Sequence, residues 1–237
     1  MTSYRQAVLD LAQSQKARRG VSLYSRFINR PLGRLLAAAA FKLGMSPNAV
    51  TVVSAIVTAA GLLVLVTGPA HPARAIIAML LLVLGFALDS ADGQVARLTG
   101  TSSATGEWLD HVVDAGKIVA VHGSVLVAAY LHLSVDDWYY LLPLAFQVVA
   151  IVTFVGGLLV ELLGRAKKDA TRSPDAPSLA RALALLPADY GVLALAIGLF
   201  GWPAVFLPVY AVLLVANAAI MALLLGKWFS KLRAASA

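Results

Sequence analysis

Two pairs of aspartates in an otherwise apolar part of the chain are the residues best suited to chemistry. Asp89 and Asp92 are three residues apart, and Asp110 and Asp114 are four residues apart, so each pair shares one face if its segment is helical. The loop between the two segments, roughly residues 98–105, is short, and this predicts that the helices are antiparallel neighbours. We therefore expect four carboxylates from two helix ends to converge on one point.

Four carboxylates so close together need positive charge between them. An acidic side chain in the middle of a membrane-spanning helix costs roughly 2.5–3.5 kcal/mol, and clustering adds repulsion between like charges. The neighbouring Arg97 cannot neutralise four aspartates. Divalent cations can, and oxygen ligands favour Mg²⁺, Mn²⁺ or Ca²⁺. A pair of metal ions suits displacement at phosphorus, because it holds both the attacking and the leaving oxygen.

Small residues beside the aspartates leave room for a ligand. Gly93 and Gly106 have no side chain, so a ligand can approach the backbone on both helices. Ala96 has a small side chain, so it leaves space on the same helix face. Arg97 offers a planar guanidinium that suits a phosphate. These features predict a site for metal ions and a phosphate-bearing ligand. The alternatives are structural ion pairing and a path that conducts cations.

The composition places these residues in a membrane protein. Of the 237 residues, 60% are hydrophobic and 13% are charged, whereas soluble domains carry about 25% charged residues. These values exclude a disordered chain and an ordinary soluble enzyme, and the absence of Cys excludes disulfides and thiol chemistry. A spanning helix needs about 20 apolar residues, and six stretches qualify: 47–67, 73–96, 107–131, 138–163, 181–201 and 203–226.

Lys and Arg gather on one side of these predicted spans. They precede the first span, follow the second, fourth and sixth, and contribute to the net charge of +7. Because such loops are usually cytoplasmic, we expect both termini and the aspartate site in the cytoplasm, with the protein in the inner membrane of a prokaryote. The charge also favours anionic membrane lipid. We expect no nucleic-acid partner, because these cations flank hydrophobic spans and form no separate basic domain.

The predicted fold class is all-α, a polytopic membrane protein with six transmembrane helices and an N-terminal amphipathic interfacial helix over residues 24–43. For residues 1–20 a solvated basic tail is an equal alternative. Ser46 followed by Pro47 predicts the start of the first span. The predicted domains are a cytoplasmic or interfacial helical segment, a six-helix transmembrane catalytic domain and a cytoplasmic tail: 1–45, 46–227 and 228–237.

The spacing of the acidic motif resembles the signature of a known enzyme family. The pattern D-x2-D-G-x2-A-R-x8-G-x3-D-x3-D runs from Asp89 to Asp114 without a mismatch. It is similar to the motif of the CDP-alcohol phosphotransferase, or CDP-alcohol phosphatidyltransferase, family of integral membrane enzymes. Eight fixed positions make a chance match rare. The layout of six spans after a surface helix is also similar, so the resemblance covers residues from about 24 to 226.

The resemblance implies a reaction and a set of site residues. Asp89, Asp92, Asp110 and Asp114 would hold two Mg²⁺ ions, with Mn²⁺ as a substitute, and Asp114 would also be the general base on the acceptor hydroxyl. The reaction would transfer a phosphatidyl group from CDP-diacylglycerol or another CDP-alcohol to an acceptor alcohol and release CMP, in phospholipid biosynthesis. A homodimer is a further implication. The residues implied for the CDP pocket are Asn48, Thr51, Gly93, Ala96, Arg97, Ser103 and Gly106.

The acceptor pocket is the least determined part. A phosphate-bearing acceptor needs cations, and the candidates are Lys117, Arg165, Lys168 and Arg181. The same cations are expected from membrane topology alone. Phosphatidylinositol-phosphate synthases of this family carry a Lys where this chain has Leu163, which argues against inositol phosphate. The alternatives to the main prediction are a soluble CDP-alcohol donor with a lipid or polyol-phosphate acceptor, a divalent cation transporter, and an inactive lipid-binding relative.

We interpret the other polar residues near the motif as parts of the protein framework or of the pocket wall. We expect His111 to be a wall residue, and Glu161 and His122 to serve in packing or hydrogen-bond networks. Glu107 is expected to flank the pocket. Asp189 and Tyr190 are placed at the start of the fifth predicted span and are expected to face the cavity.

Overall fold

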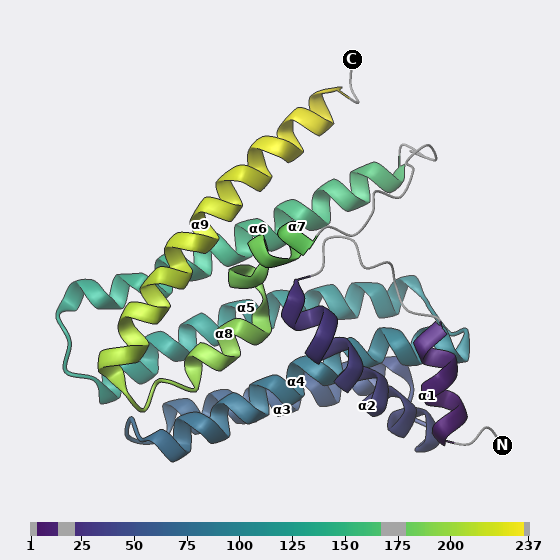
Figure 1. Cartoon of the computed structure of the whole chain (residues 1–237), viewed down its shortest axis with the longest axis horizontal. Helices are drawn as coiled ribbons and strands as arrows, with labels where there is room; N and C mark the ends of the chain where they lie inside the picture. The colour runs from purple at the N-terminus through teal and green to yellow at the C-terminus, as the bar shows by residue number, and fades with distance from the viewer. Residues whose placement is uncertain (1–3, 14–21, 167–178, 235–237) are drawn as a thin grey trace.

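The computed structural model describes residues 4–13, 22–166 and 179–234, and this part of the chain is helical with no strand (Figure 1). The all-α prediction is therefore confirmed. The long helices are α3 (Pro47–Val66), α4 (Pro72–Thr99), α5 (Ala104–His132), α6 (Leu141–Ala166) and α9 (Pro203–Ala234). The shorter ones are α1 (Tyr4–Gln13), η1 (Ser25–Asn29), α2 (Arg30–Lys42), η2 (Asp137–Tyr140), α7 (Leu179–Ala184), η3 (Leu186–Ala188) and α8 (Tyr190–Ile197).

Five helices in the described ranges are long and apolar enough to cross a membrane, and they match the predicted spans except the fifth. The predicted span over 181–201 is instead divided among α7, η3 and α8. Pro187 has no N–H to donate, and Asp189 starts a new helix by capping α8. The count of six spanning helices is therefore not confirmed.

Helix caps fix the ends of the helices that carry the site. Ser46 Oγ accepts a backbone N–H at 3.2 Å, so α3 begins at Pro47 as the sequence predicts. α4 ends at Gly100, whose φ of 68° is a left-handed conformation that favours glycine. Ser103 then caps α5 by accepting a backbone N–H at 3.1 Å. The turn between α4 and α5 is therefore short, and the two helices run in opposite directions.

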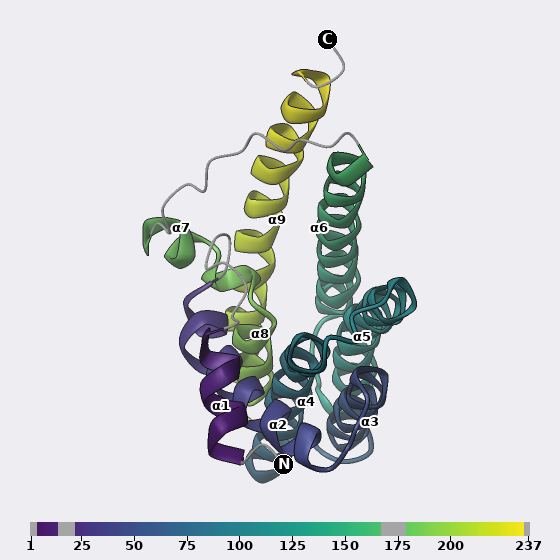
Figure 2. The ribbon, with the colours of Figure 1, turned by 90° about the vertical axis from the view of Figure 1, so that its right-hand side faces the viewer.

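α3 is the main neighbour of both α4 and α5, which make few direct backbone contacts with each other. α4 and α5 are antiparallel, as predicted, and they meet through side chains such as those of Asp89 and Asp110, while α3 packs against the backbones of both. α6 packs against α5 and α9, and α8 packs against α4 and α9 (Figure 2). Leu82, Val125, Ile197 and Tyr210 are among the buried side chains where these helices meet.

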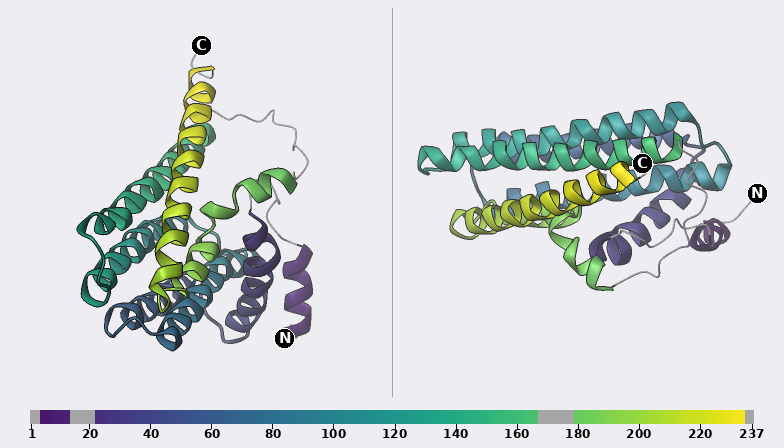
Figure 3. Two further views of the ribbon diagram at one scale, coloured as in Figure 1. Left: turned by 60° about the vertical axis from the view of Figure 1, so that its left-hand side comes forward. Right: turned by 90° about the horizontal axis from the view of Figure 1, so that it is seen from above.

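α1 and α2 lie at the same end of the molecule as the turn between α4 and α5 (Figures 1 and 3). α2 packs closely on α4, because a Cβ at Gly33 would lie only 2.9 Å from the Ser90 side chain. α1 packs on α2, with Ala7 fully buried and Tyr4 Oη donating to the Leu35 carbonyl at 3.1 Å. Residues 4–13 are therefore packed on the domain, and the rest of the predicted basic tail, 14–21, lies outside the described residues.

The outer face of η1 and α2 carries exposed apolar side chains. Phe27 is 63% exposed, and Ile28, Leu32 and Leu35 are also exposed. Gly33 and Ala37 are buried on the opposite face, against the rest of the protein. An apolar outer face is typical of a helix that lies in a membrane surface, so an interfacial position for this helix stays a prediction.

A buried carboxylate ties the segment before α2 to α8. Asp189 is 7% exposed and accepts hydrogen bonds from the hydroxyls of Ser22 and Ser25. It also accepts the backbone N–H groups of Ser25 at 3.2 Å and Gly191 at 2.8 Å. Tyr24 lies directly on Gly191, where any Cβ would clash with its ring. Asp189 was expected to face a cavity; it holds two segments together instead.

Replacing this carboxylate is expected to destabilise the fold. In Asp189→Ala, the buried donors of Ser22, Ser25 and Gly191 lose their acceptor, and hydrogen bonds to charged groups contribute about 1.5–3 kcal/mol each. We expect the free energy of unfolding to fall by about 3 kcal/mol or more, measured by thermal unfolding in detergent. Asp136→Ala removes an exposed carboxylate and serves as the control. Equal unfolding temperatures for the two variants would contradict the role given to Asp189.

Candidate functional site

Three aspartates from α4 and α5 lie together. One carboxylate oxygen from each of Asp89, Asp92 and Asp110 lies within 4.8 Å of the other two. The structure thus brings together three of the four carboxylates that the sequence singled out. A compact set of carboxylate oxygens has the donor chemistry that Mg²⁺ and Mn²⁺ prefer, so these residues fit a divalent metal site.

The fourth aspartate, Asp114, lies beside this group and is paired with a lysine. Lys117 Nζ is 3.6 Å from Asp114 Oδ1 and also donates to Asp89. It donates further to Ser54 Oγ at 2.9 Å, and Ser54 Oγ donates to the Gly85 carbonyl at 2.7 Å. Lys117, one of the candidates for acceptor binding, therefore lies among the site carboxylates and is positioned by α3.

α3 presents a row of hydroxyl groups to the aspartates. Thr51, Ser54 and Thr58 recur at helical spacing and are all buried, although most of α3 is apolar. Thr51 Oγ1 donates to Asp92 Oδ2 at 2.6 Å, and Asp92 itself is only 6% exposed. The sequence assigned Thr51 to the donor pocket but assigned no role to Ser54 or Thr58. Their shared helix face is the signal that would have identified them.

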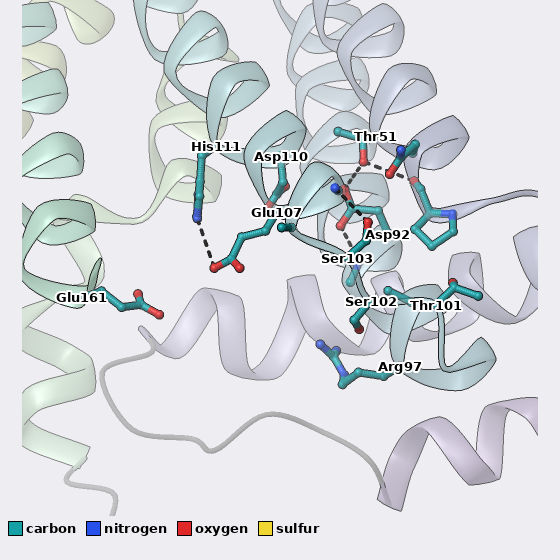
Figure 4. Close-up of a pocket in the computed structure, with 16 residues that line it drawn as sticks. Thr51, Asp92, Arg97, Thr101, Ser102, Ser103, Glu107, Asp110, His111 and Glu161 are labelled. Atoms are coloured by element: carbon teal, nitrogen blue, oxygen red, sulfur yellow. Dashed lines mark hydrogen bonds and ion pairs between the residues drawn. The ribbon is translucent and has the colours of Figure 1, made fainter. Parts of the chain in front are cut away.

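A pocket of about 510 Å³ opens beside Asp92 and Asp110 (Figure 4). Its walls come from the start of α3, the end of α4, the turn that follows, the start of α5, and α6. Every residue that the sequence assigned to the CDP pocket lines it: Asn48, Thr51, Gly93, Ala96, Arg97, Ser103 and Gly106. The predicted donor residues therefore surround one cavity next to the carboxylates.

Two glycines open this pocket in different ways. A Cβ at Gly93 would meet only the Arg97 guanidinium, at 3.5 Å, so Gly93 leaves open space over the α4 backbone. A Cβ at Gly106 would lie 3.2 Å from both Asn48 Oδ1 and Ser103 Oγ, so Gly106 allows these polar groups to approach α5. The backbone of both helices is thus accessible from the pocket, as the sequence suggested.

Positive charge gathers at the α4 end of the pocket. Arg97 lines the cavity, and its Nε is buried without a hydrogen-bond partner among the described residues. Arg30 on α2 is close enough to interact electrostatically with Arg97. A guanidinium that lines a cavity and has an unused donor suits a phosphate oxygen.

The part of the pocket away from Arg97 is formed by residues that we interpreted, from the sequence, as wall or packing residues. Glu107, His111 and Glu161 all line it, and His111 Nε2 lies 3.8 Å from Glu107 Oε1 (Figure 4). Glu107 flanks the pocket and His111 is a wall residue, as expected. Glu161 was expected to serve in packing or a hydrogen-bond network, and the structure places it on the pocket wall. It comes from α6, so this position depends on tertiary structure that periodicity alone does not reveal.

The remaining predicted acceptor residues are not brought to the pocket in the described part of the chain. Arg181 on α7 is exposed and lines neither this pocket nor the second one. The side chain of Arg165 and the whole of Lys168 lie outside the described residues. The cation-rich acceptor pocket therefore stays a prediction.

A second, smaller pocket of about 130 Å³ begins at Asp89 and Asp114. Its other walls come from α3, α4, α5, α6 and α8, and they are mostly apolar. They consist of Thr58, Phe86, Lys117, Ile118, Phe154 and Tyr190. The carboxylates thus separate a polar cavity from an apolar one.

Comparison with known proteins identifies a family and a similar fold. The sequence model of a family described as CDP-alcohol phosphatidyltransferase matches residues 44–228. No curated protein matches the chain. Among solved structures, it is similar to phosphatidylinositol phosphate synthase from Mycobacterium tuberculosis in complex with manganese and citrate. The TM-score is 0.56 at 18% sequence identity, over 82% of this chain and 87% of that one, so the likeness is one of fold.

Proposed function

Because the chain belongs to the CDP-alcohol phosphatidyltransferase family, we propose that it transfers a phosphatidyl group from CDP-diacylglycerol to an acceptor alcohol and releases CMP. The observation that supports this most directly is the group formed by Asp89, Asp92 and Asp110 at the wall of the larger pocket. Membership of a transferase family favours this activity over the divalent cation transporter that the carboxylates alone would also allow.

The three grouped aspartates, together with Asp114, are proposed to hold two Mg²⁺ ions, which Mn²⁺ can replace. When bound, these ions would offset the negative charge of the diphosphate and of the oxygens that change charge during transfer. Manganese in the similar synthase structure and the close spacing of the oxygens here support the proposal.

The larger pocket is proposed to hold the CDP part of the donor. Arg97 would donate to the diphosphate, and the nearby positive charge of Arg30 would add to the attraction. Asn48 and Thr51 would contact the cytidine side, and Gly93 and Gly106 would let the nucleotide lie against the helix backbones. These contacts orient the phosphorus that carries the lipid toward the carboxylates.

Transfer is proposed to proceed by a single displacement at that phosphorus. Asp114 accepts the proton of the acceptor hydroxyl, and the hydroxyl oxygen forms a bond to phosphorus. The bond from phosphorus to the CMP oxygen breaks, and CMP leaves with the electron pair. Lys117, held by Ser54 and Asp89, keeps the Asp114 carboxylate in place. Catalysis then relies on positioning and electrostatics, as in other phosphoryl transfers.

The position in the membrane belongs to the same proposal. Both termini and the larger pocket would face the cytoplasm of a prokaryote, because Lys and Arg flank the ends of the helices on that side. The lipid part of the donor then stays in the bilayer, while a water-soluble acceptor enters from the cytoplasm. A homodimer in the inner membrane is the proposed assembly.

The direct test is release of CMP by the purified protein in detergent or lipid. The protein is incubated with CDP-diacylglycerol, Mg²⁺ and a panel of alcohols that includes glycerol 3-phosphate, inositol phosphate and their unphosphorylated forms. We expect CMP in proportion to a new phospholipid with at least one acceptor. Release of CMP only from a soluble CDP-alcohol, with a lipid or polyol-phosphate acceptor, would establish the alternative donor instead. No CMP from any donor would refute the proposal.

Arg97 is expected to contribute to donor binding through its guanidinium fork. In Arg97→Lys the charge remains, but paired hydrogen bonds to a diphosphate are lost. Charge-assisted bonds of this kind are worth about 1.5–3 kcal/mol, so the KM for the CDP donor should rise about 10- to 100-fold. Arg181→Lys, which changes an exposed arginine away from both pockets, is the matched control. An unchanged donor KM in Arg97→Lys would contradict the assignment.

A further inference from the structure

The second pocket contains two buried hydroxyls that have no role in the steps above. Thr58 is 2% exposed, and neither its Oγ1 nor Tyr190 Oη has a hydrogen-bond partner among the described residues. The hydroxyls of Thr58 and Tyr190 are close enough to influence each other, but their geometry is not that of a hydrogen bond. Because an unsatisfied buried hydroxyl destabilises a protein, two of them in one pocket indicate a ligand that completes their bonding.

The orientation of Thr58 is unusual for a threonine inside a helix. Thr99 and Thr153 each donate to the carbonyl oxygen four residues earlier, in both cases at 2.8 Å. This bond is the ordinary way to satisfy a helical hydroxyl, and Thr58 does not make it. Its hydroxyl lies over Gly85 of α4, where an added Cβ would come within 2.3 Å of Oγ1. The absence of a side chain at Gly85 makes this orientation possible.

Tyr190 is held in place by its ring and backbone and not by its hydroxyl. It is the first residue of α8, directly after the Asp189 cap. Its ring packs against Phe86 with 5.0 Å between centroids, and Phe86 in turn stacks on Tyr24 at 6.5 Å. The phenol oxygen is therefore positioned by contacts elsewhere on the residue, and it is buried with no hydrogen-bond partner of its own among the described residues.

The other walls of the pocket suit a lipid. Phe86, Ile118 and Phe154 give it an apolar lining, and it meets the site at Asp89 and Asp114. Thr58 lies seven residues beyond Thr51 on α3, which is about 10 Å further from the entrance of the larger pocket. A substrate that reaches from one pocket to the other would thus place its polar part beside Arg97 and its apolar part here.

We propose that this pocket binds the glycerol backbone of the CDP-diacylglycerol donor, and that Thr58 and Tyr190 donate hydrogen bonds to the carbonyl oxygen of its ester linkage. This inference rests on the proposed function and specifies its lipid substrate. Both hydroxyls can donate to an oxygen placed between them, and an ester carbonyl accepts through two lone pairs. In a diacylglycerol this carbonyl lies a few bonds from the phosphate and directly before the acyl chain. The enzyme should therefore prefer ester-linked to ether-linked donors.

The test compares CDP-diacylglycerol with CDP-dialkylglycerol of the same chain length. The measured quantity is the ratio of kcat/KM values for CMP release from the two donors. We expect the wild-type protein to prefer the ester by about fivefold to tenfold, the effect of one or two neutral hydrogen bonds. The ratio should fall toward one in Thr58→Val and Tyr190→Phe, and Thr58→Ser, which keeps the hydroxyl, should retain the wild-type ratio.

A structural role for the hydroxyls predicts a different result. Because neither hydroxyl has a protein partner, Thr58→Val and Tyr190→Phe should unfold at temperatures no lower than the wild type. A wild-type protein that uses both donors equally, or variants that raise the KM for the acceptor and leave the donor ratio unchanged, would overturn the inference. Failure of the wild-type protein to release CMP from either donor would refute the proposed function itself.

Discussion

Asp114→Asn is expected to lower kcat by about 100- to 10,000-fold, the usual contribution of a general base. The substitution keeps the size of the side chain but removes its capacity to take the proton of the acceptor hydroxyl. Asp114 is absent from the lining of the larger pocket and from the group of three carboxylates. Binding of CDP itself, in the larger pocket, should therefore change little, and CMP release measured at saturating donor should reveal the loss.

His111→Gln is the matched comparison for this variant. His111 is another side chain on α5 that could accept a proton, and it lines the larger pocket. If Asp114 is the base, His111→Gln should reduce kcat by less than about tenfold, below the usual range for a general base. The reverse pattern, with near wild-type turnover in Asp114→Asn, would assign the base to His111. Titration of CDP binding to both variants separates loss of chemistry from loss of nucleotide affinity.

The local part of the site could be predicted from the sequence because its spacing is helical. Asp89 and Asp92 share a face of α4, Asp110 lies on α5 behind a short capped turn, and these facts are encoded within about twenty residues. The start of α3 at Pro47 was equally predictable, because a capping serine precedes it. Segments whose structure is set by their own residues are those that sequence reasoning describes best.

The prediction of one continuous helix over residues 181–201 was wrong because the structure of this segment depends on distant residues. A hydropathy window over 181–201 counts apolar side chains, whereas the break depends on Asp189 binding Ser22 and Ser25, more than 160 residues earlier. The same break brings Tyr190 to the second pocket, opposite Thr58 of α3. That pocket could not be inferred from periodicity, because its walls come from five helices.

The sequence left the choice of acceptor residues open for a different reason. Cations beside a span are expected from membrane topology whether or not they bind a substrate, so Arg181 could not be distinguished from a topology signal. In the structure it is exposed and away from both pockets. Lys117 carried the same ambiguity, and in the structure it donates hydrogen bonds to Asp89 and Ser54.

Removal of divalent metal is expected to abolish CMP release, and addition of Mg²⁺ or Mn²⁺ is expected to restore it. The physical reason is the grouping of Asp89, Asp92 and Asp110 within 4.8 Å, next to a pocket proposed to take a diphosphate. Without a cation, negative charge on both protein and substrate would oppose binding. Chelation followed by metal titration, with CMP as the readout, measures this dependence, and full activity in the presence of chelator would contradict it.

Direct metal binding distinguishes this site from a general ionic effect. Binding of Mn²⁺ to the purified protein can be followed by electron paramagnetic resonance without any substrate. We expect Asp92→Asn to weaken it by at least about 10-fold, because the buried Asp92 carboxylate is one of three grouped ligands and outer contacts to ligands alone change affinity by 10–100-fold. Glu161→Gln removes a carboxylate that lines the same pocket outside the group, and should leave the affinity within about threefold. Equal losses in the two variants would show that the pocket attracts cations through its net charge, and that the three aspartates do not form a defined metal site.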